Sequence, residues 1–495
     1  MLSRHFSKAK YPGLLPREKL LFERSTPGTC GLKFPEIENF QSNLGDLIRK
    51  DLDLPSLSEV QVTRHYVRMS RLNYSLDQGT YPLGSCTMKW NPRASEAAIR
   101  QTGFTDIHPL QPIKTVQGCL SALNELSDLL LKFTGMNAIT LNPAAGAHGE
   151  LAGIMAISEA LIRRGEKEKR NIIIVPDSAH GTNPASSALC GFSTRVVKSS
   201  ADGTVHPEEL KKVLDDKVAG MMLTNPNTCG LFEQNVKELA DLLHSNGSYL
   251  YFDGANMNAL FGRVNIHELG ADALHLNIHK SFATPHGGGG PGSGPVLYSE
   301  RLMKYLPYPT ISLNNNNEAT LHEEDQGESL GRMKAYHGQF MTLLRALAYV
   351  LALGGDGLKQ VAADAVMNAN YIRVMLKDYI DVAFPDTMCM HEVLFTDKKF
   401  TNHGFSTMDV AKAMIDSGYH PPTVYFPLIV TGAMLFEPTE TESKAELDEI
   451  IQGLKDIIKD AIENPKEIQK APIAAPIGRP DETLAARKPV LKYVK

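Results

Sequence analysis

The sequence predicts an α/β protein built on a mostly parallel, doubly wound sheet. From Val116 onward, short apolar segments alternate with amphipathic helical segments. This alternation requires crossover helices that cover both faces of a parallel sheet. The chain has 495 residues, of which 42% are hydrophobic and 22% charged, so it can build more than one core. We therefore expect a large sheet domain, a smaller C-terminal α/β domain and an N-terminal arm.

The large domain is predicted to begin with a helix from Val116 that ends at Gly135. Seven strands are expected after it, at Ala138–Leu141, Ile172–Val175, Ser193–Val197, Gly220–Leu223, Tyr249–Phe252, Ala273–Leu276 and Val296–Tyr298. The helices between them are expected at Glu150–Arg164, Pro184–Leu189, Pro207–Leu214, Val236–Ser245 and, as a short helix, near Asn256. Ligands bind such sheets at the carboxyl ends of the strands, so the strand-to-helix loops are the candidate site.

Four segments follow from this pattern: an N-terminal extension and arm over 1–115, a large domain over 116–330, a small domain over 331–464 and an extended tail over 465–495. The arm has many turn residues, above all between Gly79 and Pro92, and we expect it to pack against a neighbouring chain. The polar stretch Pro307–Gly331 is predicted to be a loop. Long helices are predicted from about His337 to Leu353 and from Gly357 to Lys377.

Composition indicates neither a nucleic-acid nor a membrane partner. The net charge is −5 and the isoelectric point about 6.4, and no uninterrupted apolar run reaches the roughly 20 residues of a membrane helix. Six cysteines without a CxxC pair favour a reducing compartment. The basic start, Met1 to Arg17, is similar to the beginning of a transit peptide, but a disordered extension of a cytoplasmic protein is the favoured interpretation.

Lys280 is the residue around which the chemistry is predicted. It follows the apolar alternation of Leu274, Leu276 and Ile278 and precedes a glycine-rich loop, so a strand should deliver it to a loop edge. Desolvation and the neighbouring His279 would lower the pKa of its amine, which suits Schiff-base formation. The alternative is a surface lysine at the end of a strand.

Two further features give Lys280 a context. Ala145, Gly146 and Ala147 stand at a predicted helix start, where backbone amides can bind a phosphate; a tight turn is the alternative. Asp253 ends an apolar strand, and a buried carboxylate needs a cation to face. Together these pieces fit pyridoxal phosphate: the amides hold the phosphate, Asp253 keeps the pyridine nitrogen protonated, and Lys280 carries the aldehyde as an imine.

Other loop residues complete the predicted cofactor site. His180 would stack on the ring, Ala255 would support its other face, Asn225 would reach the ring hydroxyl, and His279 adjoins the lysine. For His180 the alternative is a core histidine. The predicted catalytic residues are therefore Lys280, His180 and Asp253, and the predicted cofactor-binding residues are Lys280, Gly146, Ala147, His180, Asn225, Asp253, Ala255 and His279. No metal site is predicted, because Pro285 prevents a helix that would align His275, His279 and His286.

Four motifs resemble the glycine cleavage system P-protein family, glycine dehydrogenase (decarboxylating). They are Ser85-Cys-Thr-Met-Lys89, His180-Gly-Thr-Asn-Pro-Ala185, Asp253-Gly-Ala-Asn-Met-Asn-Ala259 and Asn277-Ile-His-Lys-Ser-Phe282. The chain is most similar to the second subunit of the two-subunit form, which carries the cofactor lysine. The resemblance implies the aspartate aminotransferase fold (fold type I), decarboxylation of glycine, and transfer of the aminomethyl group to the lipoyl arm of H-protein.

The resemblance also implies partners: a companion subunit 1 in a two-plus-two heterotetramer, and the T-protein and L-protein of the same system. Two other functions stay open at this point. One is a different pyridoxal-phosphate decarboxylase or aminotransferase, since loops alone do not fix a substrate. The other is a non-catalytic scaffold subunit. Arg93 and Arg332 are candidates for binding the glycine carboxylate.

Overall fold

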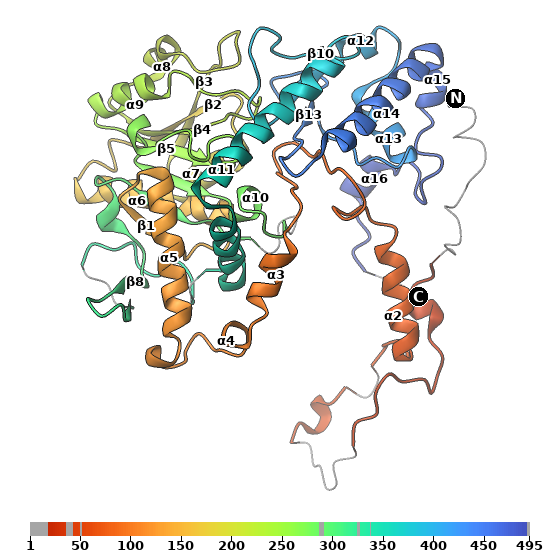
Figure 1. The fold of residues 1–495 in the computed structure, drawn as a ribbon, viewed down its shortest axis with the longest axis horizontal. Helices are drawn as coiled ribbons and strands as arrows, with labels where there is room; N and C mark the ends of the chain where they lie inside the picture. Colours follow the sequence, from red (N-terminus) through yellow and green to blue (C-terminus); the bar gives the residue numbers. More distant parts are fainter. Residues whose placement is uncertain are drawn as a thin grey trace.

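The computed structural model describes residues 18–35, 43–49, 52–286, 292–323, 327–336 and 338–492. It shows two α/β bodies with the long helix α11 running between them (Figure 1). We call the seven-stranded sheet with its helices the large domain, and the four-stranded sheet with its helices the small domain. The basic start up to Arg17 and Gly287–Gly290 of the glycine-rich loop lie outside the described residues.

The large sheet confirms the predicted fold class. Its strands are β1 (Ala138–Thr140), β2 (Ile172–Pro176), β3 (Ser193–Val197), β4 (Val218–Thr224), β5 (Tyr249–Gly254), β6 (Ala273–Leu276) and β7 (Val296–Tyr298). They lie in the order β1-β7-β6-β5-β4-β2-β3. The run from β6 to β3 is parallel, and β7 is antiparallel to both its neighbours. Because helices cover both faces, β4, β5 and β6 are apolar and buried along nearly their whole length.

The helices of the large domain mostly match their predicted ranges. They are α5 (Gln117–Thr134), α6 (Gly146–Arg163), α7 (Thr182–Leu189), α8 (Pro207–Val213), α9 (Val236–Ser245) and α10 (Ile278–Ser281), with the short 3₁₀ helices η4 (His267–Leu269) and η5 (Met303–Tyr305). Gly135 ends α5 in a left-handed conformation, φ 74°, which glycine adopts at little cost.

Three local predictions were wrong. The segment after Asn256 forms turns and no helix, because hydrogen bonds of its asparagine side chains hold the backbone in turns. Lys280 lies in the one-turn helix α10 and not on a loop edge. The stretch Pro307–Gly331 contains a hairpin of β8 (Thr310–Leu313) and β9 (Ala319–His322), whose short, mostly exposed strands gave little apolar signal.

The small domain contains a four-stranded antiparallel sheet. Its strands are β10 (Asp381–Val382), β11 (Val393–Thr396), β12 (Thr423–Val424) and β13 (Met434–Phe436), in the order β10-β11-β13-β12. Its helices are α12 (Lys398–Thr401), α13 (Thr407–Asp416) and α14 (Lys444–Glu463). The segment 465–495, predicted to be extended, instead contains the short helices α15 (Pro465–Ile468) and α16 (Glu482–Arg487). The predicted limits of the four segments stay predictions.

Helix α11 (Phe340–Leu376) joins the two domains. It merges the two long helices predicted here at a kink, where Gly354 has φ 62° and ψ −174°. In length and composition it could cross a membrane. Its buried face nevertheless packs in the protein cores, with Leu343 and Val350 in the large domain and Ile372 and Leu376 in the small one. This is the pattern of a core helix.

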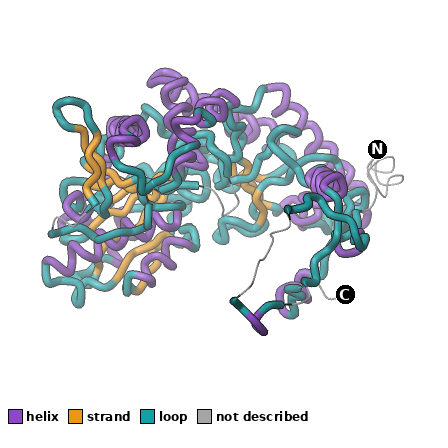
Figure 2. The backbone as a smooth tube through the Cα atoms, turned by 90° about the horizontal axis from the view of Figure 1, so that it is seen from below, coloured by secondary structure: helices purple, strands orange, loops and turns teal. Residues whose placement is uncertain are grey.

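The N-terminal arm has two parts. The described residues 18–35, 43–49 and 52–70, which include α2 (Glu59–Ser70), extend away from both domains in two perpendicular views (Figures 1 and 2). Residues after Gly79 instead pack on the chain's own domains, which corrects the prediction that this turn-rich segment packs on a neighbour. The remaining short elements of the arm are η1 (Phe22–Arg24), η2 (Gly45–Leu47), α3 (Arg93–Ile99), α4 (Thr102–Thr105) and η3 (Ile113–Thr115).

Candidate active site

Lys280 lies at the carboxyl end of β6, in the single turn of α10. The turn is held by hydrogen bonds from the Lys280 amide to the Asn277 carbonyl, 3.0 Å, and from the Ile278 amide to the Ser293 carbonyl, 3.1 Å. The side chain of Lys280 is half-buried. Its positive charge acts on the pKa of a ring of neighbours drawn from several loops: Cys86, Glu150, His180, Asp253, His275, His279, His286, His391 and Glu392. Three of the five predicted loops, those with His180, Asp253 and Lys280 itself, therefore contribute to this set, together with residues of the arm and the small domain.

Asp253 is a buried carboxylate at the end of β5 with donors on both oxygens. Oδ1 accepts from the amide of Ala255 at 3.0 Å, and Oδ2 accepts from Asn183 Nδ2 at 3.1 Å. His275 Nδ1 lies 3.6 Å from Oδ1. Burial raises the pKa of Asp253, but His275, Asn183 and the Ala255 amide more than offset it, so the pKa lies below its usual value. Asp253 is therefore an ionised acceptor at the sheet edge.

Glu150 is a second buried acid beside Asp253, which the sequence did not reveal. It accepts from Asn183 Nδ2 at 2.9 Å. Burial, reinforced by the charge of Asp253, raises the pKa of Glu150 to about 8. Glu150, Asp253 and His275 could together offer ligand atoms to a metal. However, His275 Nδ1 is bonded to the hydroxyl of Tyr251 at 2.7 Å, and Glu150 is protonated at neutral pH, so hydrogen bonds account for the cluster.

The anion site was predicted at the start of α6. The cap residue Ala145 is extended and offers no side-chain cap, so the first amides of this long helix lack an intrahelical partner. Gly146 packs closely on the lysine loop: a Cβ there would lie 2.1 Å from Asn277 Oδ1. Ala147 is exposed. The role of the Gly146 and Ala147 amides in binding a phosphate stays a prediction.

His180 precedes α7 and lies at the junction with the small domain. Its Nδ1 is 2.9 Å from Thr182 Oγ1, and its ring meets Phe426 edge-on at 5.8 Å. The ring keeps substantial exposure, yet its partial burial and the charge of Lys280 lower its pKa. Because the ring is exposed, His180 is not a core histidine. A neutral, accessible imidazole is suited to stacking on a cofactor ring.

Two predicted residues carry buried polar atoms that lack a partner among the described residues. Asn225 accepts from the Glu233 amide at 3.0 Å, but its Nδ2 is unpaired. His279 Nδ1 is also unpaired, and burial lowers the pKa of His279 to about 3, so the ring is neutral. Leaving a buried donor unpaired is costly, and a ring oxygen beside Asn225 would remove that cost. The residues present therefore fit pyridoxal phosphate.

The two arginines considered for the glycine carboxylate are engaged elsewhere. Arg93 Nη2 donates to both carboxylate oxygens of Asp77, at 2.8 and 2.9 Å, within the arm. Arg332 lies 5.4 Å over the ring of Tyr308, near the β8–β9 hairpin. The carboxylate role of both stays a prediction.

The segment Ser85–Lys89 brings small-domain acids to the site. The amides of Ser85 and Thr87 donate to Glu392 Oε2 at 2.8 Å and Glu437 Oε2 at 2.9 Å. Ser85 and Thr87 have left-handed φ values of 63° and 52°, which are rare outside glycine and point to a functional constraint. The paired residues are more than 300 positions apart in the sequence. The motif Ser85–Lys89 was therefore the one sequence feature that pointed to these contacts.

Comparisons with known proteins agree with this geometry. The family description "Aminotransferase class-V" matches residues 148–349, and "Glycine dehydrogenase, C-terminal domain" matches residues 361–475. The chain is 50% identical over 487 residues to the probable glycine dehydrogenase (decarboxylating) subunit 2 of Caulobacter vibrioides, covering 97% of this chain and 93% of that one. It is 47% identical to the protein of the same description from Listeria innocua, covering 96% of this chain and 98% of that one.

Solved structures share the fold. A glycine decarboxylase (P-protein) of the glycine cleavage system, in inhibitor-bound form, superposes with a TM-score of 0.70 at 20% identity, covering 84% of this chain and 93% of that one. A cysteine desulfurase from Thermococcus onnurineus superposes with a TM-score of 0.59 at 15% identity, covering 77% of this chain and 95% of that one. At these identities the likeness concerns the fold alone.

Proposed function

Because the chain belongs to the glycine dehydrogenase (decarboxylating) subunit 2 family, we propose that it decarboxylates glycine with pyridoxal phosphate held by Lys280. The family consists of pyridoxal-phosphate enzymes, and the fold is that of such enzymes. The observation that supports the assignment most is the ionised, buried Asp253 at the end of β5, beside the strand that carries Lys280. A scaffold subunit would have no need for an ionised carboxylate buried there.

The bound cofactor supplies an electron sink for the bond that breaks when carbon dioxide leaves. In our proposal each residue has one task. Lys280 Nζ holds the cofactor and exchanges protons with the substrate amine. Asp253 keeps a proton on the ring nitrogen, and its donors Asn183 and Ala255 fix the orientation of its carboxylate. These charges are preorganised, so they stabilise the transition state without reorganisation.

The remaining site residues orient and enclose the cofactor. The amides of Gly146 and Ala147 bind the phosphate at the start of α6. His180 stacks on one face of the ring and Ala255 supports the other. Asn225 donates its unpaired Nδ2 to the ring oxygen, and the neutral His279 lines the lysine side.

The description "subunit 2" implies a companion subunit. We further propose that the companion is P-protein subunit 1 in a two-plus-two assembly, that the aminomethyl group passes to the lipoyl arm of H-protein, and that the protein works with T-protein and L-protein in the cytoplasm. The projecting arm supports a companion, because α2 exposes Val60, Tyr66, Val67 and Met69. Apolar side chains on an extended segment are stabilised by burial against another chain.

An exchange assay tests the proposal. The chain is combined with its companion subunit and lipoylated H-protein, and incorporation of labelled bicarbonate into glycine is measured. We expect exchange that requires pyridoxal phosphate and is lost in Lys280→Ala. If the complete mixture shows no exchange with glycine but acts on another amino acid, the substrate assignment is wrong.

A further inference from the structure

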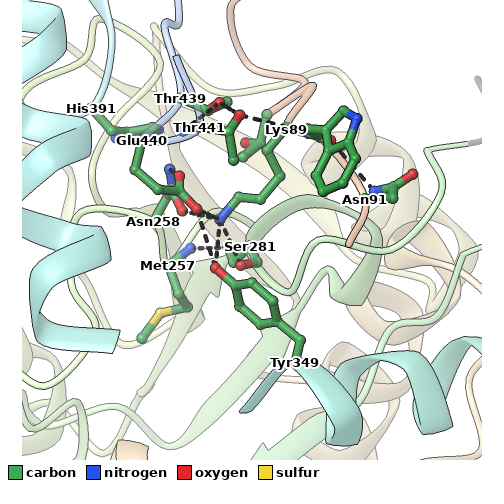
Figure 3. Close-up of polar contacts among 12 residues, drawn as sticks. Lys89, Asn91, Met257, Asn258, Ser281, Tyr349, His391, Thr439, Glu440 and Thr441 are labelled. Carbon is green, nitrogen blue, oxygen red and sulfur yellow. Dashed lines mark hydrogen bonds and ion pairs between the residues drawn. The ribbon is translucent and has the colours of Figure 1, made fainter. Parts of the chain in front are cut away.

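Lys89 is a buried lysine outside the predicted cofactor site. Only 2% of its surface is exposed. Its ammonium group has four oxygen neighbours: Asn258 Oδ1 and Glu440 Oε1 at 2.6 Å, the Ser281 carbonyl at 2.9 Å and the Tyr349 hydroxyl at 3.4 Å (Figure 3). Burial lowers the pKa of Lys89, and the charge of Glu440 opposes this effect. A buried ammonium group that is surrounded by acceptors is a specific structural feature, because burial of an unpaired charge would be costly.

The partners of Lys89 come from four separate parts of the chain. Asn258 belongs to the loop that follows β5, and Tyr349 lies on α11. Glu440 follows β13 of the small domain. Glu440 also accepts from Asn258 Nδ2 at 3.1 Å and from the Tyr349 hydroxyl at 3.1 Å. Lys89 and Glu440 therefore connect both domains, α11 and the arm at one point.

The fourth partner connects this point to the cofactor lysine. Ser281 is the last residue of α10 and follows Lys280 directly. Carbonyls at the end of a helix have no intrahelical donor, and a lysine side chain is one of the groups that can donate to them. Lys89 supplies that donor to Ser281. The same residue is held from its side chain, because Ser281 Oγ accepts from the Met257 amide at 2.7 Å.

We propose that Lys89 is a positioning residue for Lys280: its ammonium group fixes the carboxyl end of α10 against Glu440 of the small domain, so that the side chain of Lys280 keeps one orientation toward the cofactor. The proposal rests on the proposed function in that Lys280 is taken as the cofactor lysine. The contacts of Lys89 with α10 do not depend on a cofactor, so the apoprotein can report on them.

Hydrogen–deuterium exchange in the apoprotein tests this role. In Lys89→Met, amides of the peptide that contains residues 277–286 should exchange about tenfold faster or more, as expected when a hydrogen bond from a charged donor is lost. The matched control is Glu96→Gln. It weakens the pair of Arg345 with Glu96, 2.6 Å, which also ties the arm to α11 but does not contact α10. Exchange of the 277–286 peptide should be unchanged in the control. Unchanged exchange in Lys89→Met would overturn the proposal.

Removing Lys89 alone leaves Glu440 buried without its cation, which can prevent folding. If Lys89→Met does not fold, the double variant Lys89→Met/Glu440→Gln replaces it and the same comparison decides.

In the holoprotein, visible circular dichroism reports the orientation of the bound cofactor. The signal per bound cofactor should fall in the Lys89 variant and persist in Glu96→Gln. The two proposals can fail separately. If the 277–286 peptide exchanges faster in Lys89→Met but the wild-type protein binds no cofactor at Lys280, the proposed function is contradicted and the contact role of Lys89 is supported.

Discussion

Glu150 and Asp253 accept hydrogen bonds from the same amide group: Asn183 Nδ2 lies 2.9 Å from Glu150 Oε2 and 3.1 Å from Asp253 Oδ2. The two acids nevertheless differ in protonation at neutral pH. Burial and the neighbouring charge raise the pKa of Glu150 to about 8. At Asp253 the charge of His275 and the hydrogen bonds donated by Asn183 and the Ala255 amide outweigh burial and lower the pKa. When the two acids share one proton, the proton is therefore on Glu150 and the negative charge is on Asp253. The ring nitrogen of the cofactor is expected beside Asp253.

The role of Asp253 can be tested by Asp253→Asn, which keeps the shape and removes the charge. The cofactor should still bind, and turnover should fall by about two orders of magnitude or more, a barrier increase of roughly 3 kcal/mol. The measurement is kcat normalised to bound cofactor. Near-normal turnover would mean that another group stabilises the charge on the ring.

The raised pKa of Glu150 predicts that the difference in the free energy of unfolding between the wild type and Glu150→Gln depends on pH. Between the ordinary pKa of about 4.5 and the folded value of about 8, unfolded Glu150 is deprotonated while folded Glu150 keeps its proton. The folded state then binds more protons, so this group's contribution to the free energy of unfolding falls as the pH rises through that window. Gln cannot titrate.

Denaturant unfolding of both apoproteins at pH 5 and pH 8 checks this sign. Glu150→Gln should gain stability relative to the wild type on going from pH 5 to pH 8. A constant difference across that range would show that Glu150 titrates normally in the folded protein.

The phosphate end of the site is tested by Gly146→Ala. A Cβ at this position would lie 2.1 Å from Asn277 Oδ1, so the start of α6 or the lysine loop must shift. Overpacking of this kind costs about 1–3 kcal/mol, and we expect cofactor affinity to fall about tenfold or more. Gly118→Ala on α5 is the control, because a Cβ there meets nothing within 4 Å. Equal cofactor affinity in both variants would place the phosphate elsewhere.

The sequence predicted the large domain well, because its strands are buried on both faces and its helices are amphipathic. It also placed Asp253 and Asn225 at strand ends and His180 in the loop after a strand, on the side where the parallel sheet brings loops together. The cofactor roles of these residues stay predictions until they are tested.

Pairings between distant segments were beyond the reach of sequence patterns. Asn183 and Glu150 lie on helices whose periodicity marks them only as buried, and nothing local indicates that they meet Asp253. Lys89 likewise pairs with Glu440, which lies 351 positions away in the sequence. The β8–β9 hairpin has little signal in the sequence because its strands are short and the polar run Asn314–Asn317, typical of a loop, forms the turn between them.

The companion subunit is tested on the projecting arm. Val67 is 54% exposed on α2, so Val67→Asp should leave the fold intact. An aspartate in an apolar interface must be desolvated, and we expect affinity for subunit 1 to fall about tenfold or more. Sedimentation velocity of the mixed subunits measures the assembly, and far-ultraviolet circular dichroism of the variant alone is the control. Undiminished assembly would exclude this face of α2 from the contact.

The central claim, that Lys280 holds the cofactor, is tested most directly by borohydride reduction of the holoprotein followed by peptide mapping. Reduction fixes pyridoxal phosphate irreversibly to the amine that carries it. The account predicts that the label is on the peptide containing Lys280 and that Lys280→Ala remains unlabelled. A label on another lysine, such as Lys89 or Lys334, would contradict it.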